Sequence, residues 1–201
     1  MSPSGGQRAV LLDRDGTLTV EGEWLTRRQD LVLVPGAAAA LARLSAAGWK
    51  LVLVTNQSAV ARGLITPAQL EEIHAELQER VAAGGKRVAG RGARLDAIYS
   101  CPHHPTEGVG AYKVECECRK PKPGLVLQAA RELGLDLPRC WMIGDAARDL
   151  EAGWAAGVPG ILVATGKGRA EIVRLLERGR GPEAFVADLP AAAEWILSRV
   201  K

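Results

Sequence analysis

Two aspartates separated by one residue follow the first apolar run of the chain. The run Arg8–Asp13 leads directly into Asp13-Arg14-Asp15-Gly16-Thr17. If the backbone stays extended through Asp15, both carboxylates point to one side, about 7 Å apart, and they repel each other unless a cation or protons compensate. Mg²⁺ suits such a pair, because a hard cation prefers oxygen ligands and pairs well with phosphate. For this pentapeptide alone, a turn in which both aspartates cap local N–H groups is the alternative.

Polar and charged side chains also follow three later apolar runs. Thr55-Asn56-Gln57-Ser58 offers a hydroxyl and amides that can donate hydrogen bonds to phosphate oxygens. Arg119-Lys120-Pro121-Lys122-Pro123 places cations just before a predicted helix, whose N-terminus also favours anions. Asp145 and Asp149 add carboxylates that can complete a metal site. Each segment alone fits an ordinary turn, a basic loop or a helix N-cap, but the four in series indicate one site for phosphate and metal.

Three cysteines and a histidine lie close together after the third apolar run. They occur in Cys101-Pro102-His103-His104-Pro105 and, after a short Gly-containing stretch, in Cys116-Glu117-Cys118. Three thiolates and one imidazole form a standard tetrahedral Zn²⁺ site, and four protein ligands make such a zinc structural. We predict Cys101, His103, Cys116 and Cys118 as ligands, with His104 as the alternative imidazole and a disulfide as the competing interpretation. This zinc would hold Arg119 and Lys120 at the mouth of the site.

A regular alternation of apolar runs and helical patterns separates these segments. Strands are expected at Arg8–Asp13, Lys50–Val54, Leu95–Ser100, Cys140–Gly144, Gly160–Ala164 and Ala184–Ala187. Helices are expected at Gly36–Gly48, Thr66–Ala83, Pro123–Leu133, Ala147–Ala156, Arg169–Arg178 and Pro190–Val200. Such alternation predicts β–α units and a parallel sheet, which binds ligands at the carboxyl ends of its strands. The Gly- and Arg-rich stretch Gly84–Arg94 is expected to be a loop.

The composition indicates one globular domain over residues 1–201. The chain is 47% apolar and 24% charged, which excludes a disordered or fibrous chain. A net charge of +3 and an aromatic content of 4% argue against a nucleic-acid partner. No apolar window is long enough to span a membrane, and the first residues lack a signal-peptide pattern. We therefore expect a cytoplasmic monomer with neither nucleic acid nor membrane as its partner.

In their order along the chain, these segments resemble the motifs of the haloacid dehalogenase superfamily of phosphatases. The resemblance runs from about Val10 to about Val163. Its four motifs match, in order, at Asp13, Asp15 and Thr17, at Thr55, at Lys120, and at Asp145 and Asp149. The resemblance implies an α/β fold, a doubly wound parallel sheet with a Rossmann-like core. A short substrate flap and a zinc-bound loop would accompany this core, without a large cap domain.

The resemblance also implies a role for each matched residue. Asp13 would be the nucleophile that forms an aspartyl-phosphate, and Asp15 the general acid and then the general base. Thr55 and Lys120 would hold the transferring phosphoryl group. Mg²⁺ would be bound by Asp13, the backbone carbonyl of Asp15, and Asp145, with Asp149 supporting these ligands from behind.

The zinc loop narrows the resemblance to one branch of the superfamily. Together with Ala61-Arg62-Gly63 and the first two motifs, it is similar to the heptose bisphosphate phosphatases and to their relatives, the histidinol-phosphate phosphatase domains. The substrate loop of that branch corresponds to Glu21-Gly22-Glu23-Trp24-Leu25, which would contact a phosphorylated sugar together with Thr55–Ser58, Arg119 and Lys120. Arg119 suits the distal phosphate, because a guanidinium binds phosphate bidentately. Trp24 would stack on the sugar or anchor the flap.

One position departs from that branch. Many heptose phosphatases carry Lys directly after the Gly-Asp of the fourth motif, whereas this chain has Ala146. A cation that contacts the substrate is therefore missing or supplied from elsewhere. Thr165-Gly166-Lys167-Gly168 also misses the spacing of a phosphate-binding P-loop and is expected only to close the sheet. Cys140 stands alone at a strand start and is expected to be a small buried apolar residue.

The expected function is Mg²⁺-dependent removal of the 7-phosphate from a heptose 1,7-bisphosphate. A histidinol-phosphate phosphatase, or a phosphatase for another small sugar phosphate, is the enzymatic alternative. A phospho-accepting receiver domain also has strand-end aspartates on a doubly wound sheet, but the zinc loop argues against it. A sugar-phosphate binder without activity is the last alternative, and the full complement of expected catalytic groups argues against that one.

Overall fold

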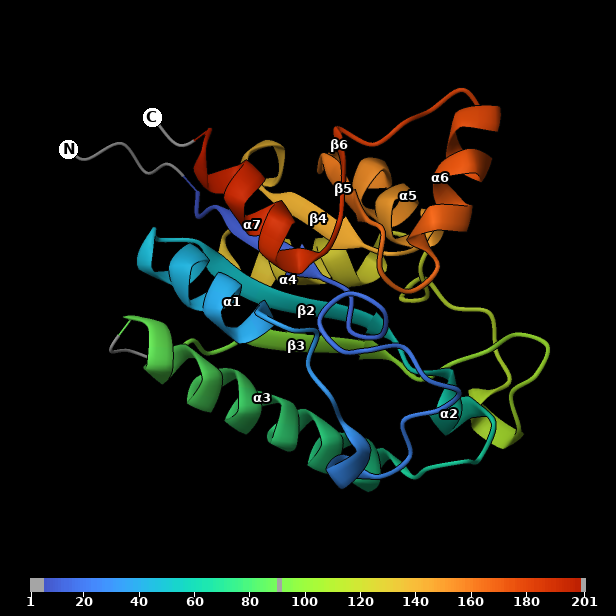
Figure 1. The fold of residues 1–201 in the computed structure, drawn as a ribbon. Helices are drawn as coiled ribbons and strands as arrows, with labels where there is room; N and C mark the ends of the chain where they lie inside the picture. The colour runs from blue at the N-terminus through green and yellow to red at the C-terminus, as the bar shows by residue number, and fades with distance from the viewer. Residues whose placement is uncertain (1–5, 90–91, 200–201) are drawn as a thin grey trace.

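The computed structural model describes residues 6–89 and 92–199, and there six parallel strands form one sheet (Figure 1). The strands are β1 (Ala9–Leu12), β2 (Lys50–Asn56), β3 (Ala97–Cys101), β4 (Trp141–Gly144), β5 (Gly160–Val163) and β6 (Ala184–Val186). Their order across the sheet is β3-β2-β1-β4-β5-β6. Because the order reverses between β1 and β4, the carboxyl ends of these two strands flank the crevice where doubly wound sheets bind ligands.

Helices cover both faces of the sheet. They are α1 (Ala37–Ala46), α2 (Ser58–Ala61), α3 (Pro67–Ala89), α4 (Gly124–Leu133), α5 (Ala147–Ala155), α6 (Gly168–Glu177) and α7 (Leu189–Leu197), with short 3₁₀ helices at Arg28–Asp30, Gly110–Tyr112 and Leu137–Arg139. Residues of α1, α3 and α7 pack in one apolar cluster, and residues of α4, α5 and α6 pack in two others. No described helix combines the length and the apolar character needed to cross a membrane.

Alternate residues of β1 pack into the apolar clusters on the two faces of the sheet. In β1, Val10 and Leu12 join the cluster of α1, α3 and α7, whereas Ala9 and Leu11 join the cluster of α4. All four side chains are fully buried, and burying a leucine stabilises the fold by roughly 1.5–3 kcal/mol. The doubly wound α/β sheet predicted from the sequence is therefore confirmed.

Helix α3 extends farther than the sequence predicted. Its start is as expected: Thr66 N donates to Gln69 Oε1 (2.8 Å) and Gln69 N donates to Thr66 Oγ1 (3.2 Å), which is a capping box. The helix continues to Ala89, so the loop predicted at Gly84–Arg94 is wrong for its first residues, and residues 90–91 lie outside the described part. A Cβ at Gly84 would overlap the Cβ of Ala38 in α1. Close packing of the two helices therefore outweighs the poor helix propensity of glycine.

The segment between β1 and α1 forms the expected flap. Two backbone hydrogen bonds close its base, from Val20 N to Val32 O (2.9 Å) and from Val34 N to Leu18 O (3.0 Å). A second long connecting segment at this edge of the sheet joins β3 to α4 and contains the cysteine loop. The described residues contain no cap domain beyond these two segments.

Candidate active site

Three carboxylates meet at the carboxyl ends of β1 and β4. Asp13 follows β1, Asp145 follows β4, and Asp149 lies in the first turn of α5. One oxygen of each lies within 4.8 Å of the others, and no residue of the three is more than 4% exposed. Asp13 N donates to Ile143 O (3.0 Å), which holds the two strand ends side by side. The parallel sheet therefore gathers acids that are far apart in the sequence.

Lys120 places its ammonium group among these acids. Its Nζ lies 2.9 Å from Asp13 Oδ1, 2.7 Å from Asp149 Oδ1 and 2.7 Å from Val54 O. The backbone of Lys120 is also held, because its N–H donates to Asn56 Oδ1 (3.0 Å) and its carbonyl accepts from Asn56 Nδ2 (3.0 Å). These contacts join the loop before α4 to the end of β2 and fix the position of the buried positive charge.

The charges of this group do not balance. Burial opposes the ionisation of Asp13, but the charges of Lys120 and Arg148 outweigh it and lower the pKa of Asp13. Burial and the negative charges of Asp149 and Asp13 raise the pKa of Asp145 to about 7. Three carboxylates thus share only two nearby cations, and the high pKa of Asp145 reflects this shortage of positive charge.

The surroundings of Asp145 fit a bound divalent cation. Asp145 Oδ2 accepts a hydrogen bond from Lys167 N (2.9 Å), and a Cβ at Gly16 or Gly166 would overlap this oxygen. Asp145 Oδ1 is buried, and among the described residues it has no hydrogen-bond partner. A free carboxylate oxygen beside Asp13, in a group short of positive charge, is a suitable donor for Mg²⁺.

Asp149 has a different role from Asp13 and Asp145 in this group. Its Oδ1 contacts Lys120, and its Oδ2 accepts a hydrogen bond from Ala146 N (3.0 Å). Both of its oxygens are therefore engaged by the protein. The supporting role expected for Asp149 behind the metal ligands stays a prediction.

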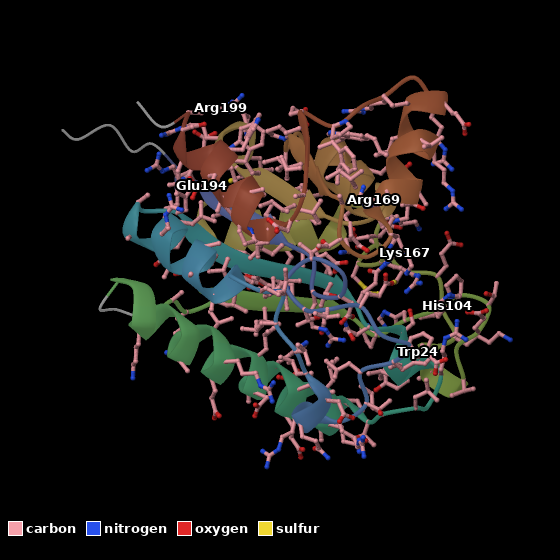
Figure 2. All side chains as sticks on the ribbon, in the orientation of Figure 1. Trp24, His104, Lys167, Arg169, Glu194 and Arg199 are labelled. Atoms are coloured by element: carbon pink, nitrogen blue, oxygen red, sulfur yellow. The ribbon has the colours of Figure 1, made fainter. Side chains whose placement is uncertain are left out.

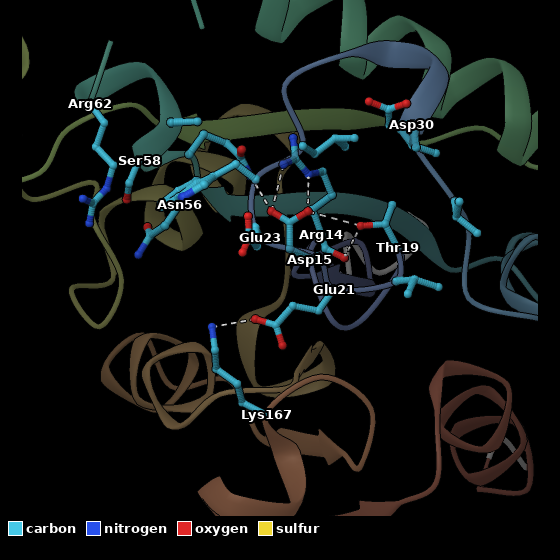
Figure 3. A pocket seen from close by; sticks show the side chains of 18 of the residues that line it. Arg14, Asp15, Thr19, Glu21, Glu23, Asp30, Asn56, Ser58, Arg62 and Lys167 are labelled. Carbon is cyan, nitrogen blue, oxygen red and sulfur yellow. Dashed lines mark hydrogen bonds and ion pairs between the residues drawn. The ribbon is translucent and has the colours of Figure 1, made fainter. Parts of the chain in front are cut away.

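Asp15 has surroundings unlike those of Asp13. Strand β1 ends at Leu12 and the chain turns after Asp13, so the extended course through Asp15 does not occur. Arg14 donates to both oxygens of Asp15, from Nε (2.9 Å) and Nη2 (2.8 Å), and Gln57 Nε2 donates to Asp15 Oδ2 (3.1 Å). The Asp15 side chain is 38% exposed and faces the pocket (Figure 3). The Asp15 side chain is therefore held by Arg14 and Gln57 and is not part of the carboxylate group, and the metal contact expected from its backbone carbonyl stays a prediction.

A pocket of about 470 Å³ lies beside the buried acids. Most of the predicted substrate contacts line it: Glu21, Gly22, Glu23, Trp24, Asn56, Gln57, Ser58 and Arg119. Thr55 and Lys120 do not line the pocket and are buried beneath it. Thr55 Oγ1 accepts a hydrogen bond from Gln57 Nε2 (2.9 Å), so Gln57 contacts both Thr55 and Asp15.

Four cations that the sequence did not place in the site also line this pocket: Arg14, Arg62, Arg148 and Lys167. Lys167 Nζ lies 2.6 Å from Glu21 Oε1 and so connects the loop after β5 to the flap (Figure 3). The position of Lys167 after a strand end was a usable signal, because the carboxyl ends of parallel strands meet at one edge. Arg148 lies between Asp145 and Asp149, and only the fold shows that it faces the pocket.

The four predicted zinc ligands come together at the end of β3 and in the loop that follows it. The sulfur atoms lie 3.1 Å (Cys118 to Cys101), 3.2 Å (Cys118 to Cys116) and 3.5 Å (Cys101 to Cys116) apart, and His103 Nδ1 lies 3.4 Å from Cys118 Sγ. These separations are far too long for a disulfide bond of about 2.05 Å, and all the cysteines are free. Four donors around one point fit a tetrahedral Zn²⁺.

His104 and Cys140 lie outside this group of predicted zinc ligands. His104 Nδ1 accepts a hydrogen bond from Glu107 N (3.1 Å), so it turns to its own loop. Cys140 is fully buried, and its Sγ contacts the backbone carbonyl of Asp136 (3.2 Å). The structure thus favours His103 over His104 and places Cys140 in the apolar interior, as expected.

The cysteine loop reaches the pocket through two arginines. Arg119 Nη1 donates to His103 O (2.9 Å) and to Ser58 Oγ (2.9 Å). Arg62 forms an ion pair with Glu107 of the loop, and its guanidinium lies 5.0 Å from the ring centroid of Trp24 in the flap. Figure 2 shows Trp24 and His104 at the same end of the molecule. The loop and the flap therefore meet at the rim of the pocket.

Comparisons with known proteins agree with this geometry. Residues 117–192 match the HAD-hydrolase-like family model. D-glycero-beta-D-manno-heptose-1,7-bisphosphate 7-phosphatase of Pasteurella multocida is 40% identical over 96% of this chain and 100% of its own length, and the D-glycero-D-manno-heptose-1,7-bisphosphate 7-phosphatase of Thermosynechococcus vestitus is 40% identical over 96% of each chain.

A solved structure is similar over the same length. The D,D-heptose 1,7-bisphosphate phosphatase from B. bronchiseptica, complexed with magnesium and phosphate, has a TM-score of 0.81 and 37% identity, and the match covers 96% of this chain and 100% of that chain. The chain therefore belongs to the D-glycero-D-manno-heptose-1,7-bisphosphate 7-phosphatase family of haloacid dehalogenase-like hydrolases.

Proposed function

We propose that this protein is a Mg²⁺-dependent phosphatase that removes the 7-phosphate of a D-glycero-D-manno-heptose 1,7-bisphosphate. The observation that carries the proposal is the buried group of Asp13, Asp145 and Lys120 beside a cation-lined pocket of about 470 Å³. The relatives of like length that bear this activity in their names support the choice of substrate. The complex of a similar phosphatase with magnesium and phosphate supports the choice of cation.

Asp13 is the nucleophile of the proposed reaction. One of its carboxylate oxygens attacks phosphorus, and the bond between phosphorus and the sugar oxygen breaks. Asp15, in its protonated form, gives its proton to that oxygen, so the sugar leaves as an alcohol and an aspartyl-phosphate remains on Asp13. Dividing the displacement in this way replaces one difficult step by two easier ones.

Asp15 then acts as the general base. Its carboxylate takes a proton from water while the water oxygen attacks phosphorus, and the bond from phosphorus to Asp13 breaks. Inorganic phosphate leaves and the Asp13 carboxylate is restored. The exposed position of Asp15 in the pocket supports both roles, because it can reach the sugar oxygen and then the water.

Asp13, Asp145 and the backbone carbonyl of Asp15 would hold Mg²⁺. When bound, this cation supplies positive charge that lowers the repulsion between the carboxylate nucleophile and the phosphate. Lys120 holds Asp13 and Asp149 in place, and Thr55 lies next to Gln57 at the base of the pocket.

The rim of the pocket suits the rest of the substrate. Arg119 would bind the phosphate that stays on the sugar, because its guanidinium is held towards the pocket by Ser58 and the carbonyl of His103. Glu21 and Glu23 can accept hydrogen bonds from sugar hydroxyls, and Trp24 can cover a sugar face. Zinc in the cysteine loop would be structural and would hold Arg119 in position.

We also propose that the chain works as a monomeric single domain in the cytoplasm. The lining of the pocket comes from one sheet of one chain, and the thiolate cluster requires the reduced cysteines that a reducing compartment maintains. Light scattering after size-exclusion chromatography would give about 21.3 kDa for such a monomer. A mass of twice that value at assay concentrations would contradict it.

The test is release of phosphate from a panel of substrates, with Mg²⁺ and with a chelator. The panel contains both anomers of the heptose 1,7-bisphosphate, histidinol phosphate and other sugar phosphates, and phosphorus NMR identifies which phosphate is lost. We expect fastest release from the 7-position of the bisphosphate and none without Mg²⁺. Preference for histidinol phosphate would instead support the related phosphatase. A phosphorylated Asp13 that persists for minutes would support a receiver domain.

A further inference from the structure

Arg148 differs from the other cations of the pocket. Among the described residues, its side chain makes no hydrogen bond and no ion pair within 4.0 Å, and its Nε is buried without a partner. The other arginines and the lysine of the pocket lining all have protein partners: Arg14 with Asp15, Arg62 with Glu107, Arg119 with Ser58, and Lys167 with Glu21. A buried N–H group without an acceptor is costly unless an anion binds it.

Lys120, the other cation of the reaction centre, lies close to three acceptors. An ammonium group carries three N–H bonds, and Lys120 Nζ has three acceptors within 2.9 Å, in Asp13, Asp149 and the carbonyl of Val54. Two of these acceptors are carboxylates, so the charge of Lys120 is already paired, whereas Arg148 has no ion pair among the described residues.

Arg148 has the location that this reaction requires. It is the second residue of α5, between Asp145 and Asp149, and it lines the pocket. Its positive charge favours the ionised forms of Asp13 and Asp149, the two acids that Lys120 contacts. A guanidinium also presents its N–H groups in a planar fork that matches two phosphoryl oxygens.

We propose that Arg148 is a further catalytic residue, which donates hydrogen bonds to the oxygens of the phosphoryl group in transfer. This inference rests on the proposed function, because it assumes phosphoryl transfer to Asp13. It differs from a role in binding the phosphate that stays on the sugar, which belongs to Arg119 at the rim.

The catalytic role of Arg148 is tested by comparing the kinetics of a substrate with one phosphate group and a substrate with two. In Arg148→Gln at saturating Mg²⁺, we expect kcat/KM to fall by about 10²–10³-fold, as for loss of one donor to a developing charge. The loss should be equal for p-nitrophenyl phosphate and for the heptose bisphosphate, because both present the same phosphoryl group. Arg148→Lys should recover part of the activity, and guanidinium ion should rescue Arg148→Ala. Unchanged kinetics, or a loss confined to the bisphosphate, would overturn the proposal.

Binding of inorganic phosphate gives a readout that does not depend on turnover. With Mg²⁺ present, calorimetry should show at least about tenfold weaker phosphate binding by Arg148→Gln, and melting curves should confirm that the variant is folded. Arg131→Gln, on the exposed face of α4, is the matched control and should bind phosphate as the wild type does. Unchanged phosphate binding by folded Arg148→Gln would overturn the inference. Absence of all phosphatase activity in the wild-type protein would instead overturn the proposed function.

Discussion

The carboxylates of Asp13 and Asp145 come from the ends of strands far apart in the chain, whereas the four zinc-type ligands lie at the end of β3 and in the one loop that follows it. The first cluster is buried at the centre of the sheet, has hard oxygen donors and keeps a free oxygen on Asp145. The second lies at the rim, has sulfur and nitrogen donors and uses all four positions. An open oxygen site suits chemistry on phosphate, and a closed sulfur site suits structure.

The two clusters also depend on the chain in different ways. The carboxylate cluster exists only when β1 and β4 pair, because its acids are brought together by the sheet. The cysteine cluster holds a loop that has few apolar contacts of its own, and its ion pairs and hydrogen bonds reach the pocket through Arg62 and Arg119. Substitutions in the carboxylate cluster should therefore abolish catalysis directly, whereas substitutions in the cysteine cluster should act through loss of zinc and of loop position.

The largest effect is expected from Asp13→Asn. The amide keeps the size of the side chain but cannot serve as the nucleophile, so kcat for phosphate release should fall by at least about 10⁴-fold. The variant should stay folded, because one of three crowded negative charges is removed. Phosphate release at saturating Mg²⁺ measures this effect, and a rate near that of the wild type would refute the assignment of the nucleophile.

A smaller loss is expected from Asp15→Asn, since Asp15 lies in the pocket and outside the carboxylate cluster. Loss of acid and base help should slow the reaction by about 10²–10⁴-fold. Hydrolysis of the aspartyl-phosphate should slow as well, so intact mass spectrometry after acid quenching should detect phosphorylated protein. If Asp15→Asn loses its phosphoryl group as fast as the wild type, Asp15 is not the base.

A weaker effect is expected from the cysteine cluster. Cys118→Ser should lose zinc and lower kcat/KM by roughly 10–100-fold, because Arg119 and its neighbours lose their support. Cys140→Ser is the matched control and should keep its zinc, since Cys140 lies in the interior away from the loop. Metal analysis and kinetics on the same samples make the comparison. Unchanged turnover by zinc-depleted protein with an ordered loop would separate the zinc from the active site.

The smallest effect is a pH dependence of stability that we expect from His74, a buried residue of α3 near Arg14 and Asp15. Burial, then the charge of Arg14, lowers the pKa of His74 to about 4, against the opposing charge of Asp15. The unfolded chain, with a histidine pKa near 6.5, binds this proton first, so stability falls as the pH drops from about 7 towards 4. Between pH 7 and pH 5.5 the loss should be about 1 kcal/mol.

His74→Gln removes this proton-linked part of the stability. Denaturant unfolding at both pH values, with Zn²⁺ and Mg²⁺ at saturating levels, should show a smaller pH dependence in the variant than in the wild type. The comparison concerns the difference between the two pH values, because the substitution itself also changes stability. Identical pH dependence in the two proteins would show that His74 does not titrate in this range.

Most of the architecture could be predicted from the sequence. The apolar runs and helical periods placed all six strands and the long helices to within a few residues, except for α3. The helix passes through Gly84 because close contact with Ala38 of α1 favours it, and such packing is invisible in a local pattern. The separate surroundings of Asp13 and Asp15 were also missed, because the end of β1 at Leu12 depends on the neighbouring strands.

The residue types and their order along the chain by themselves determined the fold class, the acids at the strand ends and the composition of the cysteine cluster. These follow from periodicity and from the donor chemistry of each side chain, which are local properties. Only the tertiary structure decided that Lys120 contacts Asp13 and Asp149, that Lys167 meets Glu21, and that Arg148 has no ion pair among the described residues. Which charge compensates which depends on distances of a few ångströms between distant segments, and packing alone sets those distances.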